Sequence, residues 1–329
     1  MNPFGPAMPA VAALLAFAVA FACLRLLLAR FGALALDRPN QRSLHDRPVP
    51  RTGGIAILAG ATVALAFDVG SLWLPVALTA VLALLSFADD TLDLPAPVRL
   101  AAHLAASGVL VWYVMSPMHP AALVALALAL TWSTNLYNFM DGSDGLAGGM
   151  AVIGFGAYAL AAHFAGASAL AALSAVLAAS AAAFLTSNFP PARIFMGDVG
   201  SIPLGFLAGA LGIVGWRDDV WPLWFPTLVF APFMCDATLT LVKRVLRGER
   251  ASHAHREHYY QRLVRMGFGH RATACIEYAA MLGCAAVALA AREQPPAAQI
   301  GALGAAASVL IAVAVWVDLR WARHVKAAL

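Results

Sequence analysis

PAALVALALALTWSTNLYNFMDGSDGLAGGMAVIGFGAYALAAHF, residues 120–164, decides the fold class. It contains two apolar stretches, 120–139 and 146–164, and each is close to the roughly 20 residues that an α-helix needs to cross the hydrocarbon core of a bilayer. Residues 140–145 between them are polar and rich in glycine, which is typical of a turn. The sequence therefore predicts two neighbouring membrane-spanning helices with a polar turn at one end.

The rest of the chain repeats this pattern. Hydrophobic residues make up 62% of the 329 residues and charged residues only 12%, whereas a soluble domain is about half apolar and about a quarter charged. The polar segments are too short to bury a core of their own. We therefore predict an all-α polytopic membrane protein with one integral membrane domain over residues 1–329. The eleven predicted spans are 8–29, 53–67, 72–88, 98–116, 120–139, 146–164, 168–187, 199–215, 222–242, 272–291 and 298–317.

The Lys and Arg residues indicate the orientation of these spans. With eleven spans, one side of the membrane holds the C-terminal tail and the loops at about 30–52, 89–97, 140–145, 188–198 and 243–271. That side carries all of the 21 Lys and Arg residues except Arg25, Arg217 and Arg292. Cytoplasmic loops are enriched in Lys and Arg, so we expect the N-terminus outside, the C-terminus in the cytoplasm and a location in the inner (plasma) membrane. The formal net charge of +4 follows from the same enrichment of Lys and Arg. It is therefore not evidence for a nucleic-acid partner, and we expect none.

Asp89, Asp90 and Asp93 form an Asp-Asp-x-x-Asp motif at the end of the third predicted span. If the helix continues for one more turn, the three carboxylates share a face. There they repel one another and meet the negative end of the helix dipole. Mg²⁺ would compensate, because it binds one or two carboxylates together with water and phosphate oxygens. The alternative is a solvated turn that ends the span.

A second cluster, Asn138-x-x-Asp141-x-x-Asp144, surrounds the turn at 140–145. It is not an EF-hand, because the twelfth position counted from Asp141 is Val152 and not glutamate. A glycine-rich turn with an aspartate as helix N-cap is the alternative, but it would explain one carboxylate and not the series. We therefore interpret this cluster as part of a polar site.

A third cluster begins at Asn188 and leads into the eighth span through Phe195-Met-Gly197-Asp198-Val-Gly200. Its glycines allow the backbone to approach a ligand closely, and the N-terminus of a helix suits a diphosphate. Asp198 would hold a metal beside the phosphates, and Phe195 could stack on a base. The alternative is that Asp198 is only an N-cap.

The loop at 243–271 contains His253, His255, Arg256 and His258. Zinc is disfavoured, because the loop has no cysteine and lacks the metalloprotease pattern His-Glu-x-x-His. Histidine and arginine are donors for phosphate or sugar oxygens, and a basic loop that lies on anionic lipid is the alternative.

Two charged residues stand apart from these clusters. Arg51 closes the arginine-rich first inner loop and could bind a phosphate in bidentate fashion, although the positive-inside rule also accounts for it. Asp236 lies inside the ninth predicted span, where a carboxylate has a functional role or a partner. Lys243, seven residues further on, is the partner that the sequence suggests.

In this order, the motifs resemble those of the polyprenyl-phosphate N-acetylhexosamine-1-phosphate transferases, over residues 37–262. The resemblance implies an eleven-helix fold with a cytosolic site. Asp198, with Asp89 and Asp90, matches the ligands of Mg²⁺, for which Mn²⁺ is the alternative. The residues that match the nucleotide-sugar site are Asn138, Asp141, Asp144, Asn188 and Phe195. The residues that match the diphosphate and sugar contacts are His255, Arg256 and His258, with Arg51 as a further phosphate contact.

One departure bears on the branch of the family. Many relatives carry His-x-His-His or three consecutive histidines in the last loop, where this chain has His255-Arg-Glu-His258-Tyr-Tyr-Gln261. This looks more like the branch that initiates O-antigen and capsule synthesis than the peptidoglycan branch.

The resemblance implies transfer of a HexNAc-1-phosphate group from a UDP-N-acetylhexosamine to undecaprenyl or another polyprenyl phosphate, with release of UMP. The product would serve surface polysaccharide synthesis, including lipopolysaccharide and cell wall biogenesis. Asp89 or Asp90 would activate the lipid phosphate directly or form a phospho-aspartate, with His255 and His258 as further catalytic residues. A membrane transporter and a lipid diphosphate phosphatase are the alternatives. The sequence leaves open the sugar, the prenol and whether the protein is a monomer or a homodimer.

Overall fold

The computed structural model describes residues 8–32, 35–37, 44, 47–66, 70–92, 94–250 and 255–328. These residues are almost entirely helical, with one short antiparallel strand pair, β1 (Leu36–Asp37) and β2 (Val49–Pro50). The α-helices are α1 (Met8–Arg30), α2 (Gly53–Ala61), α3 (Trp73–Leu92), α4 (Ala96–Met115), α5 (Pro120–Phe139), α6 (Leu146–Phe164), α7 (Ser168–Asn188), α8 (Asp198–Arg217), α9 (Trp224–Val229), α10 (Ala231–Leu246), α11 (Tyr259–Leu263), α12 (Gly269–Ala291) and α13 (Pro296–Ala328). Short helical turns, η2 (Thr62–Ala66), η3 (Gly70–Leu72) and η4 (Val264–Phe268), join some of them.

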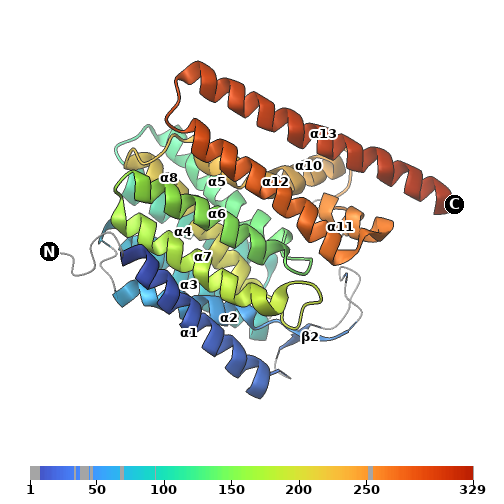
Figure 1. Ribbon diagram of the computed structural model, residues 1–329, viewed down its shortest axis with the longest axis horizontal. Coiled ribbons are helices and arrows are strands. Elements are labelled where there is room, and N and C mark those ends of the chain that lie inside the picture. Colours follow the sequence, from blue (N-terminus) through green and yellow to red (C-terminus); the bar gives the residue numbers. More distant parts are fainter. Residues whose placement is uncertain are drawn as a thin grey trace.

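The long helices run side by side in one bundle (Figure 1). Within the described residues, eight helical runs are long and apolar enough to cross a membrane: Pro9–Arg30, Ala96–Met115, Pro120–Phe139, Leu146–Phe164, Ser168–Asn188, Asp198–Arg217, Tyr259–Ala291 and Pro296–Ala327. Two shorter apolar helices, Gly53–Ala66 and Trp73–Asp89, lie where the sequence predicts the second and third spans. The prediction of an all-α polytopic membrane protein is confirmed.

α8 lies at the centre of the bundle, and nearly all of its residues are buried. It packs against α5 and α3 and also meets α2. Glycines permit these close contacts. A Cβ on Gly205 would lie 2.6 Å from Tyr137 Cβ of α5, and a Cβ on Gly54 would lie 2.4 Å from the backbone nitrogen of Gly200. The starts of α2 and α8 are therefore in backbone contact, which brings the segments that precede them together.

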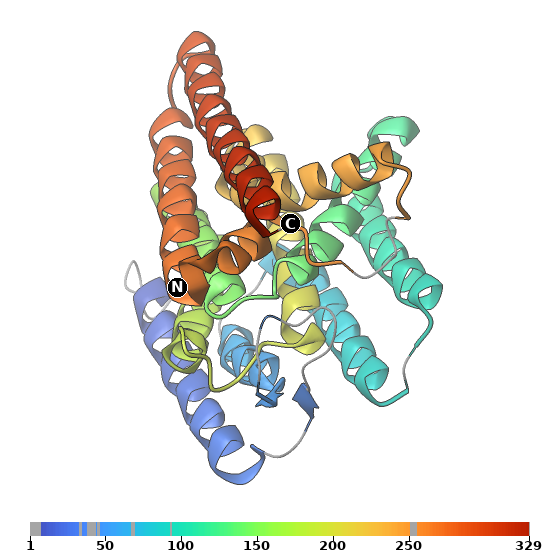
Figure 2. The same cartoon turned by 90° about the vertical axis from the view of Figure 1, so that its right-hand side faces the viewer.

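The ninth predicted span, 222–242, is not one helix. The chain leaves helical geometry at Phe230, with φ −97° and ψ 11°, and α9 and α10 lie on either side of it. Pro232 stands in the first turn of α10, where a proline is tolerated. Because it has no backbone N–H, it cannot donate to the carbonyl of Leu228 and continue the hydrogen bonding of α9. After this break the chain changes direction, and Figure 2 shows that α10 is strongly inclined to α12 and α13.

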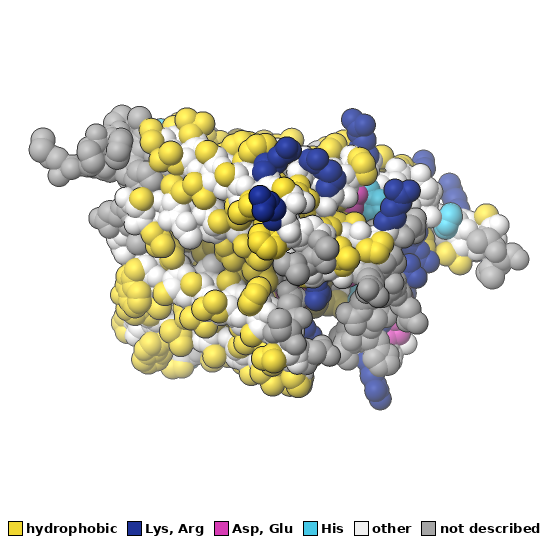
Figure 3. Space-filling view, turned by 90° about the horizontal axis from the view of Figure 1, so that it is seen from below, with side chains coloured by type: hydrophobic (Ala, Val, Ile, Leu, Met, Phe, Trp, Pro, Cys, Tyr) yellow, Lys and Arg dark blue, Asp and Glu magenta, His cyan; other side chains and the backbone are white. Residues whose placement is uncertain are grey.

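The basic side chains gather at one end of the bundle. In Figure 3 the Lys and Arg side chains lie over one half of the face shown, and the other half is largely apolar. The same end of the molecule holds β2, α11 and the C-terminus (Figure 1). The turn after α5, the segment between α7 and α8, and the start of α12 all face this end, and together they form the candidate site.

Candidate active site

A cavity of about 270 Å³ opens between these segments. It is lined by Asp37, Leu44, Arg51, Asn138, Asp141, Gly142, Ser143, Asp144, Asn188, Phe195, Gly197, Asp198 and His270. The structure thus brings together seven predicted site residues from three separate loops: Arg51, Asn138, Asp141, Asp144, Asn188, Phe195 and Asp198.

Backbone hydrogen bonds join the end of the first inner loop to the segment before α8. The Phe195 N–H donates to Pro50 O (2.7 Å), and the Gly53 N–H donates back to Phe195 O (2.9 Å). Gly197, the next lining residue, has φ +71°, and a Cβ there would lie 2.4 Å from Arg51 O. Only glycine fits this position, because a side chain would both strain the backbone and separate the two loops. This contact places Arg51 beside Asp198.

Side chains join the turn at 140–145 to the same segment. Asn188 is buried; its Oδ1 accepts the Gly145 N–H (2.9 Å) and its Nδ2 donates to Ile194 O (2.9 Å). Asp144 is also buried, and its Oδ2 accepts the Ala192 N–H (2.9 Å). These bonds fix the two segments with respect to each other, so both residues shape the cavity as well as line it.

Asn138 lies at the end of α5 and contacts the start of α8. The Ser201 hydroxyl donates to Asn138 Oδ1 (3.0 Å). This contact orients the Asn138 amide, whose Nδ2 amino group can donate to a ligand in the cavity and whose Oδ1 keeps a second lone pair.

The carboxyl groups of Asp141 and Asp198 lie close enough to repel one another when both are ionised. Burial raises the pKa of the Asp141 carboxyl well above its usual value, and the neighbouring Asp198 carboxylate raises it further, while a backbone hydrogen bond from Gly197 opposes the shift. A divalent cation would relieve this repulsion, and Mg²⁺ needs only one or two carboxylates, because water and phosphate oxygens complete its coordination. The acidic side chains of the cavity therefore fit such an ion. No group of three or more His, Cys, Asp or Glu residues that could hold a metal is found among the described residues.

Asp89 of the Asp-Asp-x-x-Asp motif does not line the cavity. Asp89 is buried near the end of α3, where it accepts hydrogen bonds from Arg99 (2.7 Å) and from the Leu94 N–H (2.7 Å). Asp90 belongs to the last turns of α3, but its side chain and the whole of Asp93 lie outside the described residues. The role of Asp89 and Asp90 as metal ligands stays a prediction.

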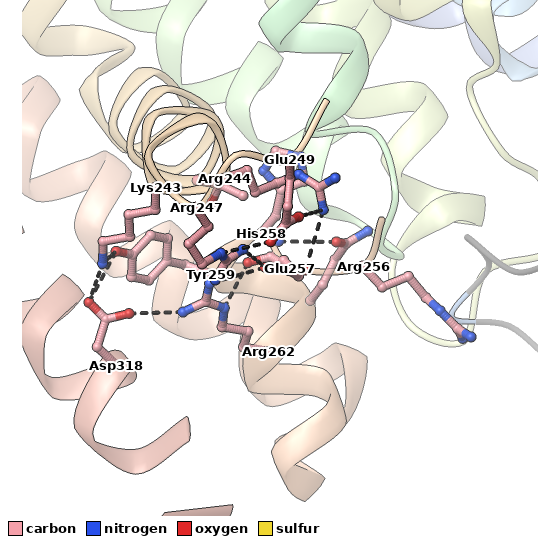
Figure 4. Close-up of polar contacts among 12 residues, drawn as sticks. Lys243, Arg244, Arg247, Glu249, Arg256, Glu257, His258, Tyr259, Arg262 and Asp318 are labelled. Atoms are coloured by element: carbon pink, nitrogen blue, oxygen red, sulfur yellow. Dashed lines mark hydrogen bonds and ion pairs between the residues drawn. The ribbon is translucent and has the colours of Figure 1, made fainter. Parts of the chain in front are cut away.

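The last inner loop forms a different environment (Figure 4). His255 and Arg256 line a separate hollow of about 590 Å³, whose other charged residues are Arg244, Arg250 and Arg265 with Glu249 and Glu257. His258 lines neither space. It is buried, and its Nδ1 lies 3.1 Å from Asp236 Oδ1. His253 lies outside the described residues.

The suggested pairing of Asp236 with Lys243 is wrong. Lys243 Nζ donates instead to Tyr259 OH (2.6 Å) and to Asp318 of α13. Asp236 accepts instead from the backbone N–H groups at the start of α11. Seven positions span about 10 Å along an α-helix, so the two residues share a face of α10 but are too far apart to pair, and each contacts Tyr259 through a different atom.

His270 is a residue of the cavity that the sequence interpretation missed. It stands in the first turn of α12, and its Nδ1 lies 2.9 Å from Ser143 Oγ and 3.3 Å from the Asp144 backbone nitrogen. Its Nε2 lies 3.3 Å from Leu44 O of the first inner loop. His270 therefore connects three loops at the cavity. The sequence feature that could have identified it is a histidine at the start of a predicted span, on the same side of the membrane as the other polar motifs.

Comparison with known proteins identifies the family of this chain. The model of glycosyl transferase family 4 matches residues 72–216, which include both clusters around the cavity. A probable undecaprenyl-phosphate N-acetylglucosaminyl 1-phosphate transferase of Bacillus subtilis is 31% identical, and the match covers 74% of this chain and 74% of that protein. The chain belongs to this family.

Two further relatives extend the comparison. A decaprenyl-phosphate N-acetylglucosaminephosphotransferase of Mycobacterium tuberculosis is 33% identical, over 77% of this chain and 74% of that protein. An undecaprenyl-phosphate alpha-N-acetylglucosaminyl 1-phosphate transferase of Escherichia coli K12 is 27% identical, over 72% of this chain and 71% of that protein. The predicted superfamily, the polyprenyl-phosphate N-acetylhexosamine-1-phosphate transferases, is confirmed, and its members are membrane-bound glycosyltransferases of the phosphotransferase type.

Proposed function

We propose that this protein transfers a HexNAc-1-phosphate group from a UDP-N-acetylhexosamine to undecaprenyl phosphate or a related polyprenyl phosphate, releasing UMP. The observation that carries the proposal is the cavity itself, in which Asp141, Asp144, Asp198 and Arg51 meet at the basic end of an apolar helix bundle. The relatives named above act on polyprenyl phosphates, and a lipid with a phosphate head needs both an apolar surface and a charged site.

The residues of the cavity suit a nucleotide diphosphate. Phe195 offers an aromatic face for the base, and Asp144 offers a carboxylate that accepts the N–H of uracil. Arg51 offers a guanidinium to the diphosphate. Catalysis of phosphoryl transfer consists mostly of such positioning and of charge neutralisation.

In the reaction, an oxygen of the lipid phosphate bonds to the sugar-bearing phosphorus of the donor, and the bond from that phosphorus to the UMP oxygen breaks. Asp198, with Asp141 beside it and with Asp89 or Asp90 as further candidate ligands, would hold a Mg²⁺ or Mn²⁺ ion. Such an ion neutralises charge on the diphosphate and on the departing UMP. Asp89 or Asp90 would also orient the lipid phosphate, directly or through a phospho-aspartate.

We further propose that the cavity faces the cytoplasm from the inner membrane, and that the product enters O-antigen, lipopolysaccharide or capsule synthesis. The first part rests on the enrichment of Lys and Arg at the cavity end. The second rests on the His258-Tyr-Tyr-Gln261 sequence of the last loop.

The test is UMP release by the purified protein, with undecaprenyl phosphate, Mg²⁺ and a panel of UDP-N-acetylhexosamines. We expect one donor to be preferred and UMP release to depend on the lipid phosphate. UMP release without the lipid would indicate a hydrolase, and no release with any donor would contradict a transferase and favour a transporter.

The Asp198→Asn variant tests the metal assignment. We expect at least a roughly 100-fold loss of UMP release, since charge neutralisation at the diphosphate is a large part of this catalysis. Asp219→Asn is the matched control, because Asp219 is exposed just beyond the opposite end of the same helix. Full activity of Asp198→Asn would overturn the assignment.

A further inference from the structure

Asp236 is a buried carboxylate with an unusually complete set of donors. Its Oδ1 accepts the Tyr259 N–H (2.9 Å) and the Thr240 hydroxyl (3.3 Å), and its Oδ2 accepts the Tyr260 N–H (2.9 Å). His258 Nδ1 adds a contact at 3.1 Å to Oδ1. Asp236 lies in α10 and the other contacts, apart from Thr240, come from the start of α11, so a single side chain joins the two helices.

Part of this arrangement is ordinary capping. The first backbone N–H groups of a helix have no partner within the helix, and an anion near them is favourable. The Gln261 side chain also accepts the His258 N–H (3.2 Å). Capping by Asp236 requires only the two backbone amides. The contact between Asp236 and the His258 imidazole is not needed for capping. It matters because His258 matches a residue of the family's diphosphate and sugar site.

The contact determines how the imidazole can be used. A carboxylate oxygen only accepts hydrogen bonds, so a proton on His258 Nδ1 completes this contact. The Gln261 N–H also faces the His258 side chain as half of a capping box and needs the opposite tautomer, but the charged carboxylate is the stronger partner. The Nε2 atom is then the ring nitrogen left for a ligand. A carboxylate that accepts from one ring nitrogen fixes the tautomer and the orientation of a histidine.

The ring is also fixed on its faces. It stacks against Phe139 at the end of α5, with ring centroids 6.4 Å apart, and against Tyr260, with centroids 5.8 Å apart. The Tyr260 hydroxyl donates to Phe139 O (3.1 Å), and a Cβ on Gly142 would lie 2.1 Å from it. Tyr260 and Phe139 therefore connect His258 to the cavity lining, to which Gly142 belongs, and the nearest ring to His258 is that of His255 in the other hollow, with centroids 4.9 Å apart.

The outer side of the same segment is held independently (Figure 4). Glu257 pairs with Arg244 and Arg247, and Arg262 donates to Asp318 Oδ1 of α13 (2.8 Å). The loop therefore has an anchor at the surface and a second anchor, Asp236, beneath it. Only the second one contacts the imidazole.

We propose that Asp236 is a positioning residue, which holds His258 with its proton on Nδ1 so that Nε2 is presented to the diphosphate of the donor. This inference rests on the proposed function for the identity of the ligand. The tautomer and the coupling between the two side chains follow from the contacts alone.

A double-mutant cycle tests the coupling. We expect Asp236→Asn to lower kcat about 10- to 100-fold, the usual effect of losing the residue that orients a functional histidine. His258→Gln should lower kcat at least as much. Adding Asp236→Asn to His258→Gln should then have little further effect, because residues that act as a unit are not additive. An equal loss in both backgrounds would show a merely structural role and overturn the proposal, as would wild-type kcat in Asp236→Asn.

Thr240→Val is the matched control, because it removes a donor from the same carboxylate and leaves the imidazole contact. We expect less than about a threefold change in kcat, given the small net contribution of one hydrogen bond. A loss as large as that of Asp236→Asn would mean that the carboxylate acts through α10 packing and would overturn the proposal. Asp236→Glu, which keeps the charge, should recover part of the activity of Asp236→Asn, and no recovery would count against the proposal.

The ¹⁵N signals of the imidazoles in the histidine-labelled wild-type protein separate this inference from the proposed function. The signal that disappears in His258→Gln should show a protonated Nδ1. An unprotonated Nδ1 would overturn the inference even if UMP release is confirmed. Absence of UMP release with every donor would instead reject the proposed function and leave the tautomer result standing.

Discussion

The cavity loops and the last inner loop are held by different forces. The turn at 140–145 and the segment 188–198 are joined by buried hydrogen bonds from Asn188 and Asp144 to backbone atoms. The outer side of the loop at 243–271 is held by ion pairs, in which Glu257 is 30% exposed and Arg247 is 48% exposed, while Asp236 anchors its inner side by buried hydrogen bonds. A buried polar group left without its partner costs about 1–3 kcal/mol, whereas an exposed ion pair contributes about 0–1 kcal/mol. The comparison predicts a rigid cavity and a last loop whose outer side adjusts more easily.

The largest expected effect comes from separating the two cavity walls. Gly197→Ala would place a Cβ 2.4 Å from Arg51 O at a φ of +71°, so Arg51 must move away from Asp198. We expect about a 100-fold or greater loss of UMP release, since displacement of a positioned group by about 1 Å has effects of this size. Gly166→Ala is the control, because Gly166 has φ +74° but no atom near its Cβ position. Similar losses in both variants would show that backbone strain alone is responsible.

A smaller effect is expected from removing one buried connection. Asn188→Ala leaves the Gly145 N–H and Ile194 O without their partner. The expected loss is about 2–4 kcal/mol in the free energy of unfolding, measured by thermal unfolding in detergent. Gln299→Ala removes an amide that also donates to backbone carbonyls, but in α13. An equal decrease in both variants would remove the contrast between the cavity and the rest of the protein.

The metal-free cavity should respond to pH. The folded-state pKa of Asp141 is raised above its ordinary value of 3.8, so the protonated form favours folding, and this stability is lost as the pH rises from 3.8 through the folded-state pKa. A divalent cation would replace the proton. We therefore expect Mg²⁺ to raise the unfolding temperature more as the pH increases over this range. An Asp141→Asn variant should lose most of that pH dependence. An unchanged pH dependence would show that the Asp141 carboxyl is not its cause.

The smallest effect is expected at the last loop. Glu257→Gln weakens the pairs with Arg244 and Arg247. The pKa of Glu257 is lowered, because partial burial raises it but the Arg247 hydrogen bond and the charges of the neighbouring arginines together lower it more. We expect at most about 1 kcal/mol of destabilisation at low salt and less at high salt, where exposed pairs are screened. A large, salt-independent loss would show that this loop is as rigid as the cavity.

Much of this arrangement follows from the sequence. The apolar stretches predict the helix bundle, and the motifs at 138–144 and 188–198 predict the side chains that meet in the cavity, because each stands at the same end of a span. The pattern does not predict which side chains pair. Asp236 and Lys243 share a face of α10, but the sequence does not show that α11 and α13 supply their partners.

His270 illustrates a second limit. A single histidine in a basic loop has no periodic or spaced partner in the sequence, and its importance arises from contacts with residues 44 and 143, which are distant along the chain.

The last loop illustrates a third limit of the sequence. The sequence groups His255, Arg256 and His258 by proximity, but the first two line a surface hollow and the third is buried.

α13 gives the last loop a dependence on the lipid itself. The helix has 33 residues, which corresponds to about 50 Å at 1.5 Å per residue, and this is longer than the roughly 30 Å hydrocarbon core. Asp318, which bonds to Lys243 and Arg262, follows the predicted span 298–317, so we expect it on the part of the helix that emerges from the membrane. A long helix tilts to match the thickness of its bilayer. We therefore expect bilayer thickness to affect the height at which α13 holds the loop that carries His258.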